Sequence, residues 1–201
     1  MLRFDRTTAL VVVDVQNDFA DPAGALAVPD APAILPVVDA AIRAARSGGA
    51  LVAYTADWHP PRTPHFAIDG GRWPVHCVAG TWGAAFHPDL PVDGPVVRKG
   101  ANGEDGYSGF TMRDPVSGST LPTALGDLIR EAGAHRVVIC GLATDYCVAA
   151  TAIDAIERGL ATTVIVDGVR AVEVRPGDGE RALAGLVAVG VHLERSDEAV
   201  A

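Results

Sequence analysis

The sequence predicts a three-layer α/β fold, in which a mainly parallel central sheet of about six strands carries helices on both faces. Short apolar runs alternate along the chain with segments of helical spacing, which is typical of parallel strands joined by crossover helices. The first run, residues 9–13, is continuous and ends in three valines, as in strands that are buried on both faces. A length of 201 residues, without a linker or an internal repeat, suits one domain over residues 1–201.

The individual elements follow from apolar spacing and from the residues that interrupt it. Apolar residues three and four apart over 34–45 predict the first helix, which the glycine pair at 48–49 ends. Leu121 and Leu125 begin a second helical pattern, which ends at Gly133. In chain order, the predicted elements are strand 9–13, helix 34–45, strand 50–55, strand 95–98, helix 121–133, strand 137–140, helix 148–156, strand 160–166, helix 181–189 and an edge strand at 191–193.

Composition restricts the partners and the compartment. A formal net charge of −9 and a pI near 5.0 argue against nucleic acid or an anionic membrane as a partner. The three cysteines are odd in number and lack the spacing of a disulfide framework, which favours a reducing compartment. Neither a leader peptide nor a membrane-length apolar run is evident, so we expect a cytoplasmic protein. The sequence does not decide between a monomer and a homo-oligomer.

Chemically useful side chains occur where the predicted strands end. Asp14 closes the first strand, Asp57 follows the second, Lys99 follows the third and Cys147 follows the fourth. Ligands of open parallel sheets bind outside the carboxyl ends of the strands, so these four side chains are expected at one edge.

Cys147 lies in the first turn of a predicted helix, in the segment Gly141-Leu142-Ala143-Thr144-Asp145-Tyr146-Cys147-Val148. Free backbone N–H groups there favour a thiolate nucleophile and can stabilise an oxyanion. Asp14 could accept the thiol proton and later pass it to a leaving amine, while Lys99 would hold both negative charges. Lys99 would also lower the pKa of Asp14, and burial would have to oppose this effect. The alternatives are a buried structural cysteine, a capping aspartate and an exposed lysine.

The segment 58–94 interrupts the alternation of strands and helices and contains all three tryptophans and four of the six histidines. Asp57 and His59 are spaced to lie on one side of an extended chain, which suits a catalytic zinc or a similar ion. His65 and His76 are the best candidates for a further ligand, ahead of His87 and Cys77; isolated surface histidines are the alternative. The aromatic residues near these groups could stack on a flat heteroaromatic substrate or simply pack in the core, and they are Phe19, Trp58, Trp73, Trp82 and Tyr107.

These segments resemble the nicotinamidase family, within the isochorismatase-like cysteine hydrolases. The resemblance covers nearly the whole chain. It is carried by Asp14-Val15-Gln16-Asn17-Asp18-Phe19, Asp57-Trp58-His59-Pro60, Trp73-Pro74-Val75-His76-Cys77-Val78, Lys99-Gly100, Tyr107-Ser108-Gly109-Phe110 and the segment around Cys147. The second and third of these segments are the more specific to nicotinamidases. The resemblance implies an isochorismatase-like fold and the hydrolysis of nicotinamide to nicotinate and ammonia through a cysteine thioester, with pyrazinamide as a second substrate.

The resemblance also implies a role for each matching residue. It implies a catalytic triad, an oxyanion hole made by backbone amides, a cis peptide before Ala143, a ring-binding pocket and one divalent ion, zinc by preference, with iron or manganese as alternatives. The assignments are Asp14, Lys99 and Cys147 for the triad; Ala143 and Cys147 for the oxyanion hole; Phe19, Trp73 and Tyr107 for the pocket; and Asp57, His59 and His76 for the ion, with His65 as a further ligand. Two alternatives remain, namely a related amidase for a carbamoyl or maleamate substrate and a non-catalytic module that binds a small ligand or a metal.

Overall fold

The protein, described by a computed structural model over residues 3–197, is built on a six-stranded sheet with the order β3-β2-β1-β6-β7-β8. Every neighbouring pair in this sheet is parallel, as predicted. The strands are β1 (Thr8–Val13), β2 (Leu51–Asp57), β3 (Val96–Lys99), β6 (Arg136–Leu142), β7 (Ala161–Arg170) and β8 (His192–Glu194).

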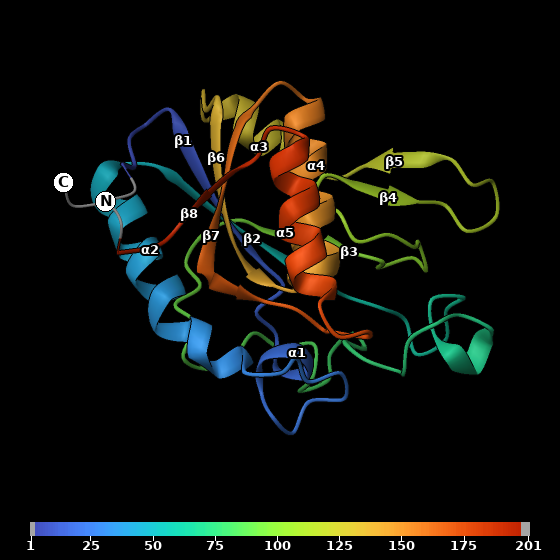
Figure 1. Cartoon of the computed structure of the whole chain (residues 1–201). Coiled ribbons are helices and arrows are strands. Elements are labelled where there is room, and N and C mark those ends of the chain that lie inside the picture. The colour runs from blue at the N-terminus through green and yellow to red at the C-terminus, as the bar shows by residue number, and fades with distance from the viewer. Residues whose placement is uncertain (1–2, 198–201) are drawn as a thin grey trace.

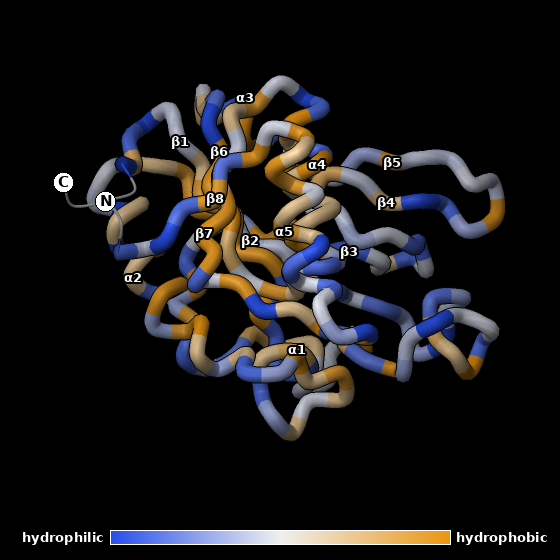
Figure 2. Tube along the Cα trace, in the orientation of Figure 1, coloured by the Kyte–Doolittle hydropathy of each residue, from blue (hydrophilic) through white to orange (hydrophobic). Residues whose placement is uncertain are grey.

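Helices cover both faces of this sheet, with α2 on one side and α3, α4 and α5 on the other (Figure 1). The helices are α1 (Asn17–Ala20), α2 (Leu35–Gly48), α3 (Leu125–Glu131), α4 (Ala149–Glu157) and α5 (Asp178–Ala188). Successive residues of β1 explain the two layers, because Leu10 and Val12 pack with α2 while Val11 and Val13 pack with α4. The central strands are accordingly among the most apolar parts of the chain (Figure 2).

One predicted element is wrong at its beginning. Leu121 lies in β5 (Thr120–Pro122), which pairs with β4 (Thr111–Arg113) in an antiparallel hairpin, and the helix begins only at Leu125. Pro122 has no amide hydrogen for a helix interior, and the Thr123 hydroxyl accepts a hydrogen bond from the Leu125 amide at 3.1 Å. The helical pattern in this region is therefore one turn shorter than its apolar residues indicate.

The segment 58–94 contains little regular structure, as its composition predicts. It has a short 3₁₀ helix, Ala67–Asp69, isolated bridges within the segment and one bridge to Gln16. A second 3₁₀ helix, Ala31–Ile34, precedes α2, and a π-helical turn, Thr144–Val148, precedes α4. Within residues 3–197, none of the helices has the length and apolarity needed to cross a membrane.

Candidate active site

The carboxyl ends of four strands bring the predicted reactive residues together. Asp57 and Lys99 are the last residues of β2 and β3, rather than residues beyond them, and Asp14 directly follows β1. Cys147 lies in the π-helical turn after β6. Because these strands are parallel neighbours, their ends converge on one edge of the sheet.

Lys99 lies at the centre of this group and is almost fully buried, with 1% of its surface exposed. Its Nζ is 2.7 Å from Asp14 Oδ2, 2.8 Å from Asp57 Oδ1 and 3.4 Å from Cys147 Sγ, and it donates a hydrogen bond to the Tyr107 carbonyl at 3.1 Å. Burial disfavours its charge, but the two carboxylates outweigh that effect and raise the pKa of Lys99 well above its ordinary value. The ammonium ion is therefore a permanent positive charge in this cluster.

Burial has the largest effect on the pKa values of Asp14 and Cys147. It raises the pKa of Asp14 above its ordinary value in spite of the Lys99 ammonium, so Asp14 is a better base than a surface aspartate. Burial also raises the pKa of the Cys147 thiol well above its usual range; Lys99 opposes this shift, and the nearby carboxylates add to it. Desolvation thus favours the protonated thiol over the thiolate that the sequence leads us to expect, and a base such as Asp14 is needed to remove its proton.

The turn that carries Cys147 has an unusual backbone. The Leu142–Ala143 peptide is cis, as expected from the resemblance, and Gly141 has a φ of 115°. A side chain at Gly141 would overlap the backbone carbonyl of Val13, so the close contact between β6 and β1 requires glycine. The carbonyl of Ala143 accepts hydrogen bonds from the amides of Tyr146 and Val148 at 3.1 and 3.0 Å, which closes the turn.

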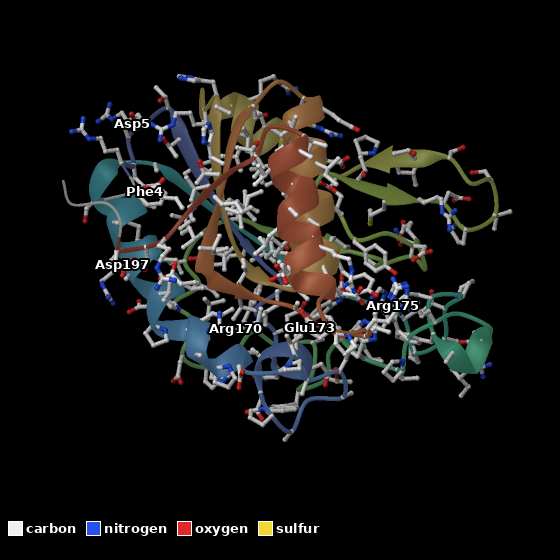
Figure 3. All side chains as sticks on the ribbon, in the orientation of Figure 1. Phe4, Asp5, Arg170, Glu173, Arg175 and Asp197 are labelled. Atoms are coloured by element: carbon white, nitrogen blue, oxygen red, sulfur yellow. The ribbon has the colours of Figure 1, made fainter. Side chains whose placement is uncertain are left out.

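Asp145 connects this turn to the segment that follows β7. Its carboxylate accepts hydrogen bonds from the amides of Val172 and Glu173 at 2.9 and 3.1 Å. Figure 3 shows Glu173 close to the beginning of α5. The Glu173 carboxylate accepts hydrogen bonds there from the amides of Gly177 and Gly179 at 2.6 and 3.0 Å. The first turn of α5 and the turn that carries Cys147 are thus held together by hydrogen bonds to carboxylates.

Three buried histidines form a second cluster beside Lys99. The ring nitrogens of His59, His65 and His76 that face one another lie within 4.8 Å. Asp57 Oδ2 completes the group, at 3.8 Å from His59 Nε2 and 3.9 Å from His76 Nε2. Although burial opposes ionisation, Lys99 and His59 hold the pKa of Asp57 well below its usual range, so the carboxylate is charged.

The hydrogen bonds of these histidines suit a divalent cation. His76 Nδ1 donates to the Pro74 carbonyl at 2.7 Å, which leaves Nε2 with its lone pair. Burial lowers the pKa of His76 to about 4, so this ring is neutral at pH 7. Both ring nitrogens of His59 are buried without a hydrogen-bond partner among the described residues, which is costly unless a ligand is bound there. The four side chains therefore offer the donor set of a zinc-type ion.

Asp105, which the sequence did not single out, holds His65 in this cluster. His65 Nδ1 donates to Asp105 Oδ1 at 2.7 Å, and this hydrogen bond contributes most to lowering the pKa of Asp105 to about 2. A carboxylate that orients a histidine in this way is common beside metal ions. His87 does not join the cluster, since its Nδ1 instead accepts a hydrogen bond from the Asp89 amide at 3.2 Å. Cys77 is also absent from the cluster, and its Sγ lies 3.8 Å from the Gly83 carbonyl.

A pocket of about 340 Å³, including solvent at its mouth, opens onto both clusters. The three ring-binding residues of the sequence prediction, Phe19, Trp73 and Tyr107, all line it, whereas Trp58 and Trp82 do not. Trp73 Nε1 donates to the Tyr107 hydroxyl at 3.0 Å. The remaining lining residues are Leu26, Asp57, His65, His76, Leu142, Ala143, Tyr146, Cys147 and Val172.

Tyr146 is a wall residue that the sequence analysis missed, although it directly precedes Cys147. Its ring meets Trp73 edge-on at 4.8 Å and Tyr107 at 5.2 Å between ring centroids. The mouth of the pocket is therefore aromatic, while its floor contains the Cys147 thiol and the Asp57 carboxyl group, both in contact with the buried Lys99 behind them. Such a site can hold a flat ring and direct a substituent of that ring toward a nucleophile.

Comparison with known proteins agrees with this geometry. Residues 8–198 match the isochorismatase domain family. The chain is 36% identical to a nicotinamidase of Escherichia coli (strain K12), over 92% of this chain and 93% of that protein. It is 40% identical to a nicotinamidase/pyrazinamidase of Mycobacterium tuberculosis, over 79% of this chain and 84% of that protein.

Two solved structures show the same fold. The pyrazinamidase of Pyrococcus horikoshii in complex with zinc is 41% identical, with a TM-score of 0.83 over 94% of this chain and 99% of that one. PnC1 from L. infantum in complex with nicotinate is 34% identical, with a TM-score of 0.87 over 97% of this chain and 96% of that one. On its sequence and its fold, the chain belongs to the isochorismatase family.

Proposed function

We infer that this protein is a nicotinamidase, which hydrolyses nicotinamide to nicotinate and ammonia, and that it also hydrolyses pyrazinamide to pyrazinoate. The observation that carries this inference is the position of Cys147 in an aromatic pocket, with Lys99 and Asp14 directly behind it and a cluster of three histidines beside it. Nicotinamide and pyrazinamide both present a carboxamide on a flat ring that contains nitrogen, which matches the two parts of the pocket.

The reaction begins with transfer of the Cys147 proton to Asp14. The two groups lie within 4.8 Å of each other, and Lys99 offsets the charge of the thiolate as it forms. The sulfur attacks the carboxamide carbon, and the backbone amides of Ala143 and Cys147 stabilise the resulting oxyanion. Asp14 then gives its proton to the departing ammonia, which leaves a thioester on Cys147. A water molecule, deprotonated by Asp14, attacks the thioester; the C–S bond breaks to release the carboxylic acid, and Asp14 returns its proton to the Cys147 thiolate.

Asp57, His59, His65 and His76 would hold one divalent ion, and we propose zinc. When bound, the ion supplies a positive centre that attracts the ring nitrogen of the substrate. Phe19, Trp73 and Tyr107 would fix the plane of the ring, so the carboxamide is presented to Cys147. We place the enzyme in the cytoplasm, which suits its three unpaired cysteines.

An open-chain substrate of the carbamoyl or maleamate type has no ring for these aromatic walls, so we regard such an amidase as the second candidate. The test is the release of ammonia by the purified enzyme from nicotinamide, from pyrazinamide and from maleamate. Removal of metal by a chelator and its replacement by zinc form the second arm of this test. We expect metal-dependent release from both aromatic amides and little from maleamate. A folded, zinc-loaded sample that releases no ammonia from either aromatic amide would refute the proposal.

Cys147→Ala provides the matching control for the nucleophile. It should abolish turnover but keep zinc and nicotinamide bound, because the ring-binding walls and the histidines are unchanged. Cys140→Ala changes a cysteine that is buried in the sheet, in the core that packs against α2, and should keep its activity. Substantial turnover by Cys147→Ala would exclude Cys147 as the nucleophile, whereas loss of binding in both variants would indicate a general defect in folding.

A further inference from the structure

Residues 16–18, which follow Asp14, pair along their length with the segment that supplies three of the four proposed metal ligands. Gln16 forms an antiparallel bridge with Phe86. The amides of Asn17 and Asp18 donate to the carbonyls of Ala85 and Gly83 at 2.9 and 3.0 Å. Two of the side chains in residues 16–18 contact backbone at or next to a proposed ligand, since Gln16 bonds to the backbone of Asp57 and Asp18 to the amide of Cys77, the residue after His76.

The Gln16 side chain holds Asp57 by both of its backbone groups. Gln16 is fully buried; its Oε1 accepts a hydrogen bond from the Asp57 amide at 2.8 Å, and its Nε2 donates to the Asp57 carbonyl at 2.7 Å. Nε2 also donates to the Ala84 carbonyl at 2.9 Å, so the amide has three buried partners. The direction of the Asp57 side chain matters because its carboxylate makes two contacts. Oδ1 contacts Lys99 Nζ, and Oδ2 faces His59. Two-point contact at the backbone fixes the direction in which this carboxylate leaves the chain.

Asp18 holds the residue after His76 in a comparable way. Its buried carboxylate accepts hydrogen bonds from the Cys77 amide at 2.6 Å and from the Ala25 amide at 2.9 Å. Cys77 has a φ of 45°, a left-handed conformation that costs free energy for a residue other than glycine. A charge-assisted hydrogen bond to its amide stabilises that conformation and with it the direction of the preceding histidine.

The chain packs closely around Asp18. A side chain at Gly83 would overlap the Asp18 carboxylate, so the segment 58–94 is pressed directly against it. Phe19, the next residue, places its ring 5.4 Å from that of His76 between ring centroids. The short segment after Asp14 therefore supports His76 both by a backbone hydrogen bond and by ring contact.

We propose that Gln16 and Asp18 are positioning residues of the metal site, which fix Asp57 and His76 through the backbone and so set the affinity and geometry of the bound ion. This inference rests on the proposed metal site. Loss of an outer contact to a metal ligand typically lowers metal affinity about 10- to 100-fold. Asp14 lies two residues before Gln16, so the six residues 14–19 supply the general base and support two ligands of the ion.

The test uses the full-length protein, stripped of metal and titrated with zinc against a chromophoric chelator. The variants are Gln16→Met and Asp18→Asn, with Asn17→Leu as the matched control. The Asn17 side chain donates to the Trp82 carbonyl at 2.8 Å, so it anchors the same segment at a position that bears no ligand. We expect Gln16→Met and Asp18→Asn to bind zinc roughly 10- to 100-fold more weakly. Asn17→Leu should keep the wild-type affinity.

The visible absorption spectrum of bound cobalt(II) reports the coordination geometry, which a loss of protein stability alone would not change. We expect the spectrum of the cobalt-loaded protein to change in Gln16→Met and Asp18→Asn but not in Asn17→Leu, with urea unfolding measured for all three. If Gln16→Met does not fold, Gln16→Glu keeps an acceptor for the Asp57 amide and replaces it.

Two results would overturn the inference, and a third would refute the metal site on which it rests. Wild-type affinity and spectrum in both Gln16→Met and Asp18→Asn would overturn it directly. Equal losses in all three variants, including Asn17→Leu, would also overturn it, because they would indicate general loosening of the segment. Wild-type protein that binds neither zinc nor cobalt would instead refute the metal site itself.

Discussion

Lys99 Nζ lies 2.8 Å from Asp57 Oδ1, so the ammonium ion that contacts the Cys147 sulfur also contacts the carboxylate that faces His59 and His76. The two clusters of the site therefore share one buried cation. Lys99 lowers the pKa of both carboxyl groups in a region where burial opposes their ionisation; for Asp57 the lowering prevails, whereas for Asp14 burial leaves the pKa above its ordinary value.

Replacing Lys99 by Met should affect both clusters. We expect kcat to fall by roughly 10³-fold or more, because the developing thiolate loses its counter-charge. Zinc affinity should also fall, and it should depend more steeply on pH, because Asp57 loses the neighbouring charge that lowers its pKa. The measurements are steady-state ammonia release and zinc competition between pH 6 and 8. Arg98→Met is the control, because the Arg98 guanidinium lies over the Trp58 ring, outside the pocket. Unchanged zinc affinity in Lys99→Met would show that the clusters are independent.

The pH profile should reflect Asp14 rather than a free thiol. Asp14 acts as a base only when ionised, and burial raises its pKa above the ordinary value of 3.8. Activity should therefore be lost as pH falls through a midpoint above 3.8. Because the thiol pKa is also raised and its proton goes to Asp14, kcat/KM should not rise between pH 8 and 9, where a free thiol would ionise. A rise in that range, measured at saturating zinc, would contradict proton transfer to Asp14.

The positions of Asp14, Lys99 and Cys147 could be predicted from the sequence because each follows or ends an apolar run. Parallel strands deliver such residues to one edge whatever the length of the intervening chain. Gln16 and Asp105 could not be found in this way. Their hydrogen bonds join positions about 40 residues apart and have no local pattern. The hairpin of β4 and β5 was missed for a related reason: its strands are three residues long and β5 is exposed, so Leu121 resembled a helical residue.

The carboxylate of Asp105 should determine how well His65 serves as a ligand. In Asp105→Asn the Nδ1 proton of His65 loses its charged acceptor, so the ring is held less firmly and is a weaker donor. We expect zinc affinity to fall roughly 10-fold or more, as measured by chelator competition. Arg113→Met is the control, since Arg113 contacts Asp105 Oδ2 at 3.2 Å from a largely exposed position and should change zinc affinity little. Equal zinc affinity in Asp105→Asn and wild type would remove His65 from the ligand set.

Tyr107 should contribute to substrate binding more than to the chemical step. Its hydroxyl accepts a hydrogen bond from the Trp73 indole N–H at 3.0 Å, which fixes the two rings relative to each other. Its contact with Lys99 is made by the backbone carbonyl instead. Tyr107→Phe removes the first contact and keeps the second. We expect KM for nicotinamide to rise by roughly 2- to 12-fold, the equivalent of one hydrogen bond of about 0.5–1.5 kcal/mol, with kcat nearly unchanged.

Tyr54→Phe is the matched control for this substitution, because it removes a hydrogen bond of 2.7 Å to the Pro91 carbonyl and does not touch the pocket. Both variants should lose comparable stability in urea, but only Tyr107→Phe should change KM. If Tyr107→Phe lowered kcat at constant KM, its hydroxyl would act on the reacting groups rather than on the position of the ring. Thioester formation measured in a single turnover would then be slowed, whereas a positioning role leaves that rate unchanged at saturating substrate.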